Sequence, residues 1–399
     1  MKKTFIFAAA LAMACALVSC KSEEQKLSEL VDKALEASAV RAHVLAENVL
    51  PEEGLLPRTF EDGKLQTCSY PWWVSGFFPG TLWMLSEQFP ADTLLRTRAE
   101  EFTARAEPAQ WLTNTHDLGF MIYCSAGQGY RLTGSQRYLD DILNACKSLS
   151  TRYNPKVGLI MSWNPSEKWR YPVIIDNMMN LEMLMFGAEK SGNDSLRTIA
   201  LSHAEKTIRN HFRQDYSSYH VVSYNPETGE AEAHQTAQGY ADESAWARGQ
   251  AWGLYGYTMM YRMSGKPEFL EQARHIAAFI ADNPNLPEDG IPYWDFNAPD
   301  IPSALRDASA GAVMASAYLE LSTYVEGEES ERWKNLAVKQ IKTLSSPEYL
   351  AGENELGGFI LKHSVGNKPK NSEVDVPLTY ADYYYVEALV RLKSLLSAD

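Results

Sequence analysis

The sequence has few of the residues that build metal or disulfide sites. Its 399 residues include five cysteines, and two of these, Cys15 and Cys20, lie in the N-terminal segment. The other three, Cys68, Cys124 and Cys146, are odd in number, and no two have the spacing of metal ligands. This pattern excludes a disulfide framework and a zinc site. It predicts that the three thiols are small buried side chains.

Basic residues are also in short supply. The chain has 37 Lys and Arg against 51 Asp and Glu, a formal charge of −14. Nucleic-acid binding draws most of its affinity from basic side chains, so we expect no nucleic-acid partner. The overall charge does not favour an anionic ligand either, so local cations must hold any such ligand.

Long apolar runs are absent except at the N-terminus. Lys2 and Lys3 precede an apolar run, residues 4–18, that is too short for an ordinary membrane helix. The run ends in Leu-Val-Ser-Cys (17–20), which resembles the lipobox of bacterial lipoproteins; the alternative is a plain signal peptide with an incidental cysteine. We therefore expect residues 1–19 to be removed and Cys20 to carry lipid.

A short polar segment follows the expected lipid site. We expect residues 20–34 to form a lipidated tether. Without residues 1–19 the chain has 35 basic residues against 51 acidic ones, a charge of −16. The lipid is then the expected membrane contact, on the periplasmic side or the outer surface of a Gram-negative outer membrane. The sequence does not indicate an oligomeric state.

Residues 35–399 are expected to form one all-α domain, because no Ser-, Gly- or Pro-rich linker divides them. Apolar residues recur at helical spacing, and no convincing strand periodicity competes with them. The predicted helices cover residues 26–47, 76–89, 92–107, 117–132, 136–151, 175–191, 194–212, 246–263, 267–282, 307–325, 329–345 and 380–396.

The connections between these helices alternate between short loops and long, aromatic-rich segments. Six such pairs predict an (α/α)6 toroid, in which six inner helices run parallel and six outer helices return. An open superhelical array of helix pairs is the alternative. The small residues of segment 308–312 (Ala-Ser-Ala-Gly-Ala) favour the closed ring because they allow close packing. In a closed ring the N-termini of the inner helices gather on the face that carries the long connections.

Two aspartates stand at the starts of predicted inner helices. Asp117 and Asp176 could simply be helix caps, which is the commoner role of an aspartate there. Two carboxylates that converge on one cleft could instead hydrolyse a sugar derivative, with one donating a proton and the other setting its pKa. The helix dipole lowers both pKa values, so the acid hypothesis needs the two groups close enough for repulsion to raise one of them.

Aromatic and cationic side chains gather near other inner-helix starts. Arg248 and Trp252 could bind a carboxylate and stack on a ring, although close helix packing is the alternative reading of their segment. Trp72 and Trp73 begin another such segment. With 10 Trp, 21 Tyr and 14 Phe, the chain has an excess of aromatics that fits sugar stacking.

Other polar residues have a plainer interpretation. His220 and His234 are predicted to lie in loops, where a lone histidine is usually a surface or hydrogen-bonded residue. Asp295, Arg306 and Asp307 are expected to form salt bridges or helix caps.

Six motifs occur in order along the chain: Trp-x-Ser-Gly-Phe-Phe-Pro-Gly (73–80), His-Asp-Leu-Gly-Phe (116–120), Asp-Asn-Met-Met-Asn (176–180), Arg-Gly-Gln-Ala-Trp-Gly-Leu-Tyr-Gly (248–256), Pro-Tyr-Trp-Asp-Phe (292–296) and Asp-Tyr-Tyr-Tyr-Val-Glu-Ala-Leu (382–389). Together they resemble glycoside hydrolase family 88, the unsaturated glucuronyl hydrolases, over roughly residues 35–395. The resemblance implies an (α/α)6 fold.

The resemblance also implies a reaction. The substrate carries a terminal 4,5-unsaturated glucuronic acid left by a polysaccharide lyase, and glycosaminoglycan disaccharides are the first expectation. The enzyme hydrates the C4=C5 vinyl ether, and rearrangement of the hemiketal releases an open-chain 4-deoxy-5-keto-uronate. No metal or organic cofactor is implied.

Residue roles carry over by motif. Asp176 resembles the general acid/base, and Asp117 resembles the second carboxylate, which holds sugar hydroxyls and raises the pKa of Asp176. Two alternatives stay open: an unsaturated rhamnogalacturonyl hydrolase that acts on pectin fragments, and a helical glycan-binding lipoprotein without catalysis. The residues expected to bind the substrate are His116, His220, Gln238, Arg248, Trp252 and Trp73, with Gln238 and His220 placed by their spacing back from Arg248.

Overall fold

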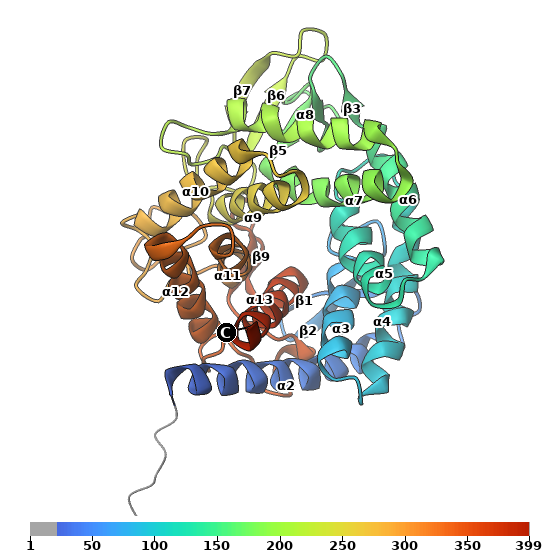
Figure 1. The fold of residues 1–399 in the computed structure, drawn as a ribbon, viewed down its shortest axis with the longest axis vertical. Coiled ribbons are helices and arrows are strands. Elements are labelled where there is room, and N and C mark those ends of the chain that lie inside the picture. Colours follow the sequence, from blue (N-terminus) through green and yellow to red (C-terminus); the bar gives the residue numbers. More distant parts are fainter. Residues whose placement is uncertain (1–21, 399) are drawn as a thin grey trace, which may run out of the picture.

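A computed structural model describes residues 22–398, and Figure 1 shows their helices arranged as a ring. The α-helices are α2 (Glu23–Val49), α3 (Phe77–Gln88), α4 (Thr93–Ala106), α5 (Gln128–Thr133), α6 (Gln136–Ser150), α7 (Leu181–Ser191), α8 (Asp194–His211), α9 (Ala247–Ser264), α10 (Pro267–Asp282), α11 (Ala308–Ser322), α12 (Gly327–Leu344) and α13 (Thr379–Ala398). Shorter helical segments are η1 (Glu107–Trp111), η2 (Gly119–Gly127), η3 (Ile175–Asn180), η4 (Leu356–Gly358) and η5 (Lys368–Lys370).

The inner helices form a closed ring. They are α3, η2 with α5, η3 with α7, α9, α11 and α13; each packs against the next, and α13 packs against α3. The outer helices α2, α4, α6, α8, α10 and α12 each pack on an inner partner (Figure 1). The twelve predicted helices and the (α/α)6 toroid are therefore confirmed, and the open array is not.

Residue composition separates the two layers. Nearly all residues of α11 are buried, because its alanines, serines and glycine let neighbours approach on every side. Its outer partner α12 buries only one stripe, Trp333, Ala337, Gln340, Ile341 and Leu344, as expected of an amphipathic helix. The inner α5, α7 and α9 end at glycines with positive φ, Gly134, Gly192 and Gly265, which turn the chain into the short loops.

The first helix corrects the predicted tether. Helix α2 begins at Glu23 behind a capping box formed by Ser22 and Gln25, and Val31 and Ala34 are buried in the core. Residues 23–34 thus belong to the helical domain, which begins before residue 35. Residues 1–19 and Cys20 lie outside the described residues, and the tether predicted for 20–34 can include at most the residues before Glu23.

Short strands occupy the long connections, where none was predicted. The antiparallel pairs are β1 (Leu56–Glu61) with β2 (Lys64–Cys68), β3 (Tyr153–Asn154) with β4 (Leu159–Ile160), β5 (Pro172–Ile174) with β6 (Val221–Tyr224), β6 with β7 (Ala231–Gln235), and β8 (Ser364–Asn367) with β9 (Ser372–Val376). Strands of two to six residues are too short for a readable alternation.

One strand pair positions the site. In the β5–β6 pair Ile174 lies opposite Val221, so the chain just before Asp176 runs beside the chain just after His220. The two inner segments that carry the aspartates also differ from the prediction of regular α-helix. Asp117 stands just before the π-helical η2, and Asp176 lies in the first turn of the 3₁₀-helical η3.

Two smaller observations complete the fold. Cys124 and Cys146 are buried, as predicted, whereas Cys68 is partly exposed. Among the helices of residues 22–398, none combines the length and apolarity that a membrane span requires.

Candidate active site

Both aspartates reach one cavity at the end of the ring that carries the long connections. The cavity has a volume of about 80 Å³. Its lining residues are Trp73, His116, Asp117, Trp163, Ile174, Asp176, Gln238 and Arg248. The convergence that the acid hypothesis required is therefore present. The lining comes from four long connections and two inner-helix starts, so only the closed ring brings it together.

Asp117 is held as an ionised carboxylate. His116 Nε2 lies 3.1 Å from its Oδ1, and the Thr115 hydroxyl donates to its Oδ2 at 2.6 Å. Burial acts to raise the pKa of Asp117, but the nearby His116, the two hydrogen bonds and Arg152 outweigh it and lower the pKa below its usual value. This side chain suits a fixed negative charge rather than a proton donor.

Asp176 has the opposite character. Its Oδ2 has no hydrogen-bond partner among the described residues, and His220 Nε2 lies 3.7 Å from it. Burial raises the pKa of Asp176 to about 6, although His116 and Arg248 act against it. The charge of Asp117 also raises this pKa, as predicted, but it contributes less than burial. A carboxyl group with this pKa can donate a proton near neutral pH.

His220 presents a neutral N–H group toward Asp176. Its Nδ1 accepts from the backbone N–H groups of Ala237 at 3.0 Å and Gln238 at 3.2 Å. These two donors fix the neutral tautomer with the proton on Nε2. Burial, together with nearby Arg248, lowers the pKa of His220 to about 3, so the ring stays neutral. His220 is thus a site residue, whereas the exposed His234 bonds to the Asn210 carbonyl at 3.1 Å.

Arg248 is buried and already bonded on one side. Its Nη1 donates to Asp307 Oδ2 at 3.0 Å, and its Nη2 donates to the Gly366 carbonyl at 2.6 Å. Its Nε has no partner among the described residues, and the guanidinium lies 4.5 Å from the Trp246 ring centre. Nη1 also donates to the Val365 carbonyl, so Asp307 and the chain at residues 365–366 fix a cation that lines the cavity. Gln238 is held near the same point, because its Nε2 donates to the Gly366 carbonyl at 3.2 Å.

Some of the tryptophans line the cavity, and another is buried in the hydrophobic core. Trp73 lines the cavity and packs on Tyr380 with ring centres 4.8 Å apart. Trp252, predicted to contact the substrate, does not line the cavity; it is fully buried between Phe120 and Tyr384. Trp163 is a wall residue that the sequence motifs missed, because it lies in a connection with no helical pattern.

The remaining polar residues support the loops, as expected. Asp307 caps α11 by accepting from the Ser309 N–H at 3.0 Å. Asp295 accepts from the Tyr240 N–H at 2.9 Å and the Ser244 hydroxyl at 2.7 Å. Arg306 forms an ion pair with Asp289.

The chemistry open to this cavity is narrow. It combines one protonatable carboxyl group, one fixed carboxylate, a neutral imidazole N–H and a buried guanidinium, with indole rings as walls. This set can protonate a bound molecule, activate water on the same carboxyl group, and stabilise an anionic substituent.

Known proteins are similar to this chain in sequence and in fold. No protein-family model matches the chain. It is 45% identical over 326 residues to the unsaturated glucuronyl hydrolase of Formosa agariphila, covering 81% of this chain and 80% of that protein. It is 34% identical over 330 residues to the unsaturated glucuronyl hydrolase of Bacillus sp. strain GL1, covering 80% of this chain and 86% of that protein. A crystal structure of an unsaturated glucuronyl hydrolase specific for heparin matches with a TM-score of 0.89 at 46% identity, covering 92% of this chain and 98% of that one.

Proposed function

The chain belongs to the unsaturated glucuronyl hydrolases of glycoside hydrolase family 88, and from this premise we propose how its cavity acts and on which glycan. The substrate is an oligosaccharide whose non-reducing end is a 4,5-unsaturated glucuronic acid. The reaction is hydration of the C4=C5 vinyl ether, which releases 4-deoxy-5-keto-uronate.

Asp176 serves as the acid and then as the base. Its proton passes to C4, and the positive charge that develops at C5 and the ring oxygen is stabilised by the ionised Asp117 in the same cavity. Water then adds to C5 while Asp176 takes the proton back. The resulting hemiketal opens and expels the neighbouring sugar. No covalent bond between enzyme and sugar is needed.

The neighbouring groups orient the sugar. Arg248 presents its remaining donors to the uronate carboxylate, and the neutral His220 donates from Nε2 to an oxygen of the sugar. His116 supports Asp117, while Trp73 and Trp163 contact the apolar face of the ring.

One observation supports this proposal above the others. A buried carboxyl group with a pKa of about 6 and an oxygen without a partner shares a cavity with a carboxylate that is held ionised. A glycan-binding protein without catalysis has no need for this difference between two acids. The test is loss of the ultraviolet band of the conjugated enol acid when purified protein meets lyase-digested glycans. Binding without band loss in every glycan would favour the non-catalytic alternative.

We propose heparin-derived disaccharides as the preferred glycan. The support is the solved structure at 46% identity, whose enzyme is described as specific for heparin. Rates of band loss should then be fastest with lyase-digested heparin and slower with chondroitin and hyaluronan digests. Faster turnover of pectin fragments than of all three would instead indicate an unsaturated rhamnogalacturonyl hydrolase.

We also propose that the protein is a lipoprotein of the periplasmic side or outer surface of the outer membrane. The lipobox at Cys20 supports this, and the start of α2 at Glu23 would place the domain close to the lipid. Cys20→Ala should move the protein from the membrane fraction to the soluble fraction. Unchanged membrane association would contradict lipidation.

A further inference from the structure

Arg152 is a buried arginine that joins two long connections beside the cavity. It lies in the turn between α6 and β3, and only 5% of its surface is exposed. Its Nε donates to the Met161 carbonyl at 2.7 Å, and its Nη1 donates to the Thr113 carbonyl at 2.8 Å. Nη1 also donates to Asn164 Oδ1 at 3.2 Å, and Nη2 donates to the Ser162 carbonyl at 3.3 Å. One guanidinium therefore holds residue 113 to residues 161–164.

These bonds brace the chain just before each aspartate. Thr113 lies four residues before Asp117 in the same connection. Ser162 continues the brace, because its hydroxyl accepts from the Ile174 N–H at 2.9 Å. Ile174 lies two residues before Asp176. The position of one side chain outside the cavity is thus coupled to both acids inside it.

The charge of Arg152 has no bonded counter-ion. Its bonds go to carbonyl and amide oxygens, and it forms no ion pair with a carboxylate within residues 22–398. Burial lowers the pKa of Arg152, while Tyr171 and Asp117 act against burial. Burial likewise acts to raise the pKa of Asp117, and Arg152 acts against it together with His116 and Thr115. The two buried charges therefore stabilise each other through the protein interior.

From this geometry we propose that Arg152, which does not line the cavity, is a positioning residue that fixes the Asp117 segment and supplies the positive charge that balances its carboxylate. This inference rests on the proposed function. The titratable and charged groups that face Asp117 are His116 from its own segment, Asp176 from η3, and Arg152 from the turn after α6. Among them, the guanidinium alone keeps its charge at every working pH. Arg152 therefore stabilises the ionised form of Asp117 over the whole range of activity.

The pH profile of kcat/KM tests this charge. Turnover needs ionised Asp117 and protonated Asp176, so kcat/KM falls below the pKa of the first and above the pKa of the second. Arg152→Gln should raise the pKa of Asp117, which moves the lower limb of the profile upward by roughly one pH unit. The upper limb should stay near pH 6, because burial contributes most to the raised pKa of Asp176. Circular dichroism at each pH gives the folded fraction by which the rates are divided.

Two further variants separate charge from structure. Arg152→Lys keeps the charge but cannot reach all four oxygens, so its lower limb should stay near that of the wild type even if stability falls. Arg105→Gln is the matched structural control. Arg105 also binds backbone carbonyls, those of Glu52 at 3.0 Å and Leu55 at 2.8 Å, but these residues do not line the cavity. This variant should lose stability without moving either limb.

A third variant leaves every bond of Arg152 in place, and so remains informative if Arg152→Gln does not fold. Asn164→Asp turns the amide oxygen that Arg152 contacts into a carboxylate. Arg152 then has a counter-ion and acts less on Asp117, so the lower limb should move upward. Ser166→Asp adds the same charge two residues farther along this exposed connection, and it should move the limb less.

The two proposals fail in different ways. Loss of the enol-acid band with the wild type tests the proposed function alone. A lower limb that stays in place in folded Arg152→Gln, or that moves equally far in Arg152→Lys or Arg105→Gln, overturns the role of the Arg152 charge and leaves the reaction intact. Equal lower limbs in Asn164→Asp and Ser166→Asp overturn it as well.

Discussion

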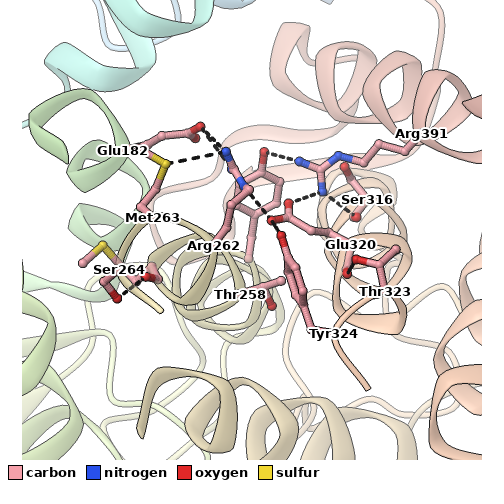
Figure 2. Close-up of polar contacts among 12 residues, drawn as sticks. Glu182, Thr258, Arg262, Met263, Ser264, Ser316, Glu320, Thr323, Tyr324 and Arg391 are labelled. Carbon is pink, nitrogen blue, oxygen red and sulfur yellow. Dashed lines mark hydrogen bonds and ion pairs between the residues drawn. The ribbon is translucent and has the colours of Figure 1, made fainter. Parts of the chain in front are cut away.

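The two ends of the ring each contain a cavity lined by charged side chains, but those side chains are paired at one end and partly unpaired at the other. At the end with the short loops, a cavity of about 380 Å³ is lined by Glu182, Arg262, Glu387 and Arg391 among others, whereas the cavity with Asp117 and Asp176 has about 80 Å³. Figure 2 shows Arg262 between Glu182 and Glu320, with Arg391 on the far side of Glu320. The larger cavity is thus not the one with acid chemistry.

Pairing explains the difference. In the short-loop end Arg262 lies 2.7 Å from Glu320 and 3.0 Å from Glu182, and Arg391 lies 2.7 Å from Glu320. Burial acts to raise the pKa of Glu320, but the two arginines lower it below its usual value. Asp176 is buried without such a partner, so its pKa stays at about 6. Buried polar groups are normally bonded, so an unpaired carboxyl oxygen inside a cavity, next to a second carboxylate, suggests a functional role for Asp176.

The largest expected effect is the loss of turnover when Asp176 is replaced. Asp176→Asn keeps the shape of the side chain but cannot transfer the proton, so kcat should fall by about 10²–10⁴-fold. Substrate affinity should change little. Turnover measured by the ultraviolet band and affinity measured by calorimetry separate the two effects, and near-normal turnover would remove Asp176 from the mechanism.

The matching change at the other end should affect stability instead. Glu320→Gln leaves Arg262 and Arg391 without their shared charge, which should cost about 3 kcal/mol in the free energy of unfolding. The kcat of the folded variant should equal that of the wild type. Urea unfolding measures the loss, with Glu100→Gln in the exposed pair with Arg96 as the control that should change little.

The unpaired carboxylate of Asp176 should also lower the free energy of unfolding of the wild type. Its pKa is about 6 in the folded chain and ordinarily 3.8, so ionisation favours the unfolded state. Asp176→Asn should therefore raise the free energy of unfolding by about 2–3 kcal/mol at pH 8 relative to the wild type. The gain should shrink as pH falls from 6 and vanish below about pH 4. A destabilised variant at pH 8 would show that the ionised side chain has a partner.

A smaller effect concerns why the pKa of Asp176 is raised. The value of kcat/KM should fall as pH rises through about 6, because the acid form is lost. Burial contributes most to the raised pKa of Asp176. The residual activity of Asp117→Asn should therefore still decline near pH 6, at a pH only slightly lower than in the wild type. A decline near pH 4 in that variant would mean that repulsion from Asp117 sets the pKa.

The sequence predicts the ring well because its signals are local. Twelve amphipathic or small-residue segments are readable at helical spacing, and their alternation with long connections brings Asp117 and Asp176 together. The start of α2 was also readable, since Ser22 and Gln25 have the spacing of a capping box. The predicted helix instead begins at residue 26, because the polar residues after Cys20 resemble a tether.

Other features depend on tertiary contacts. Trp163 joins the cavity wall through a connection without periodicity. Trp252 has the right motif, but the pattern of an inner helix does not show which side faces the cavity, and this ring is in the core. The tautomer of His220 is fixed by backbone groups of residues 237 and 238, and no residue type encodes that.

The most direct measurement is loss of the enol-acid band, followed in parallel for the wild type, Asp176→Asn and Glu320→Gln, with rates normalised to folded protein. We predict equal rates for the wild type and Glu320→Gln, and almost none for Asp176→Asn. An active Asp176→Asn, or a folded but inactive Glu320→Gln, would contradict the proposal that Asp176 is the acid and that catalysis takes place at its end of the ring.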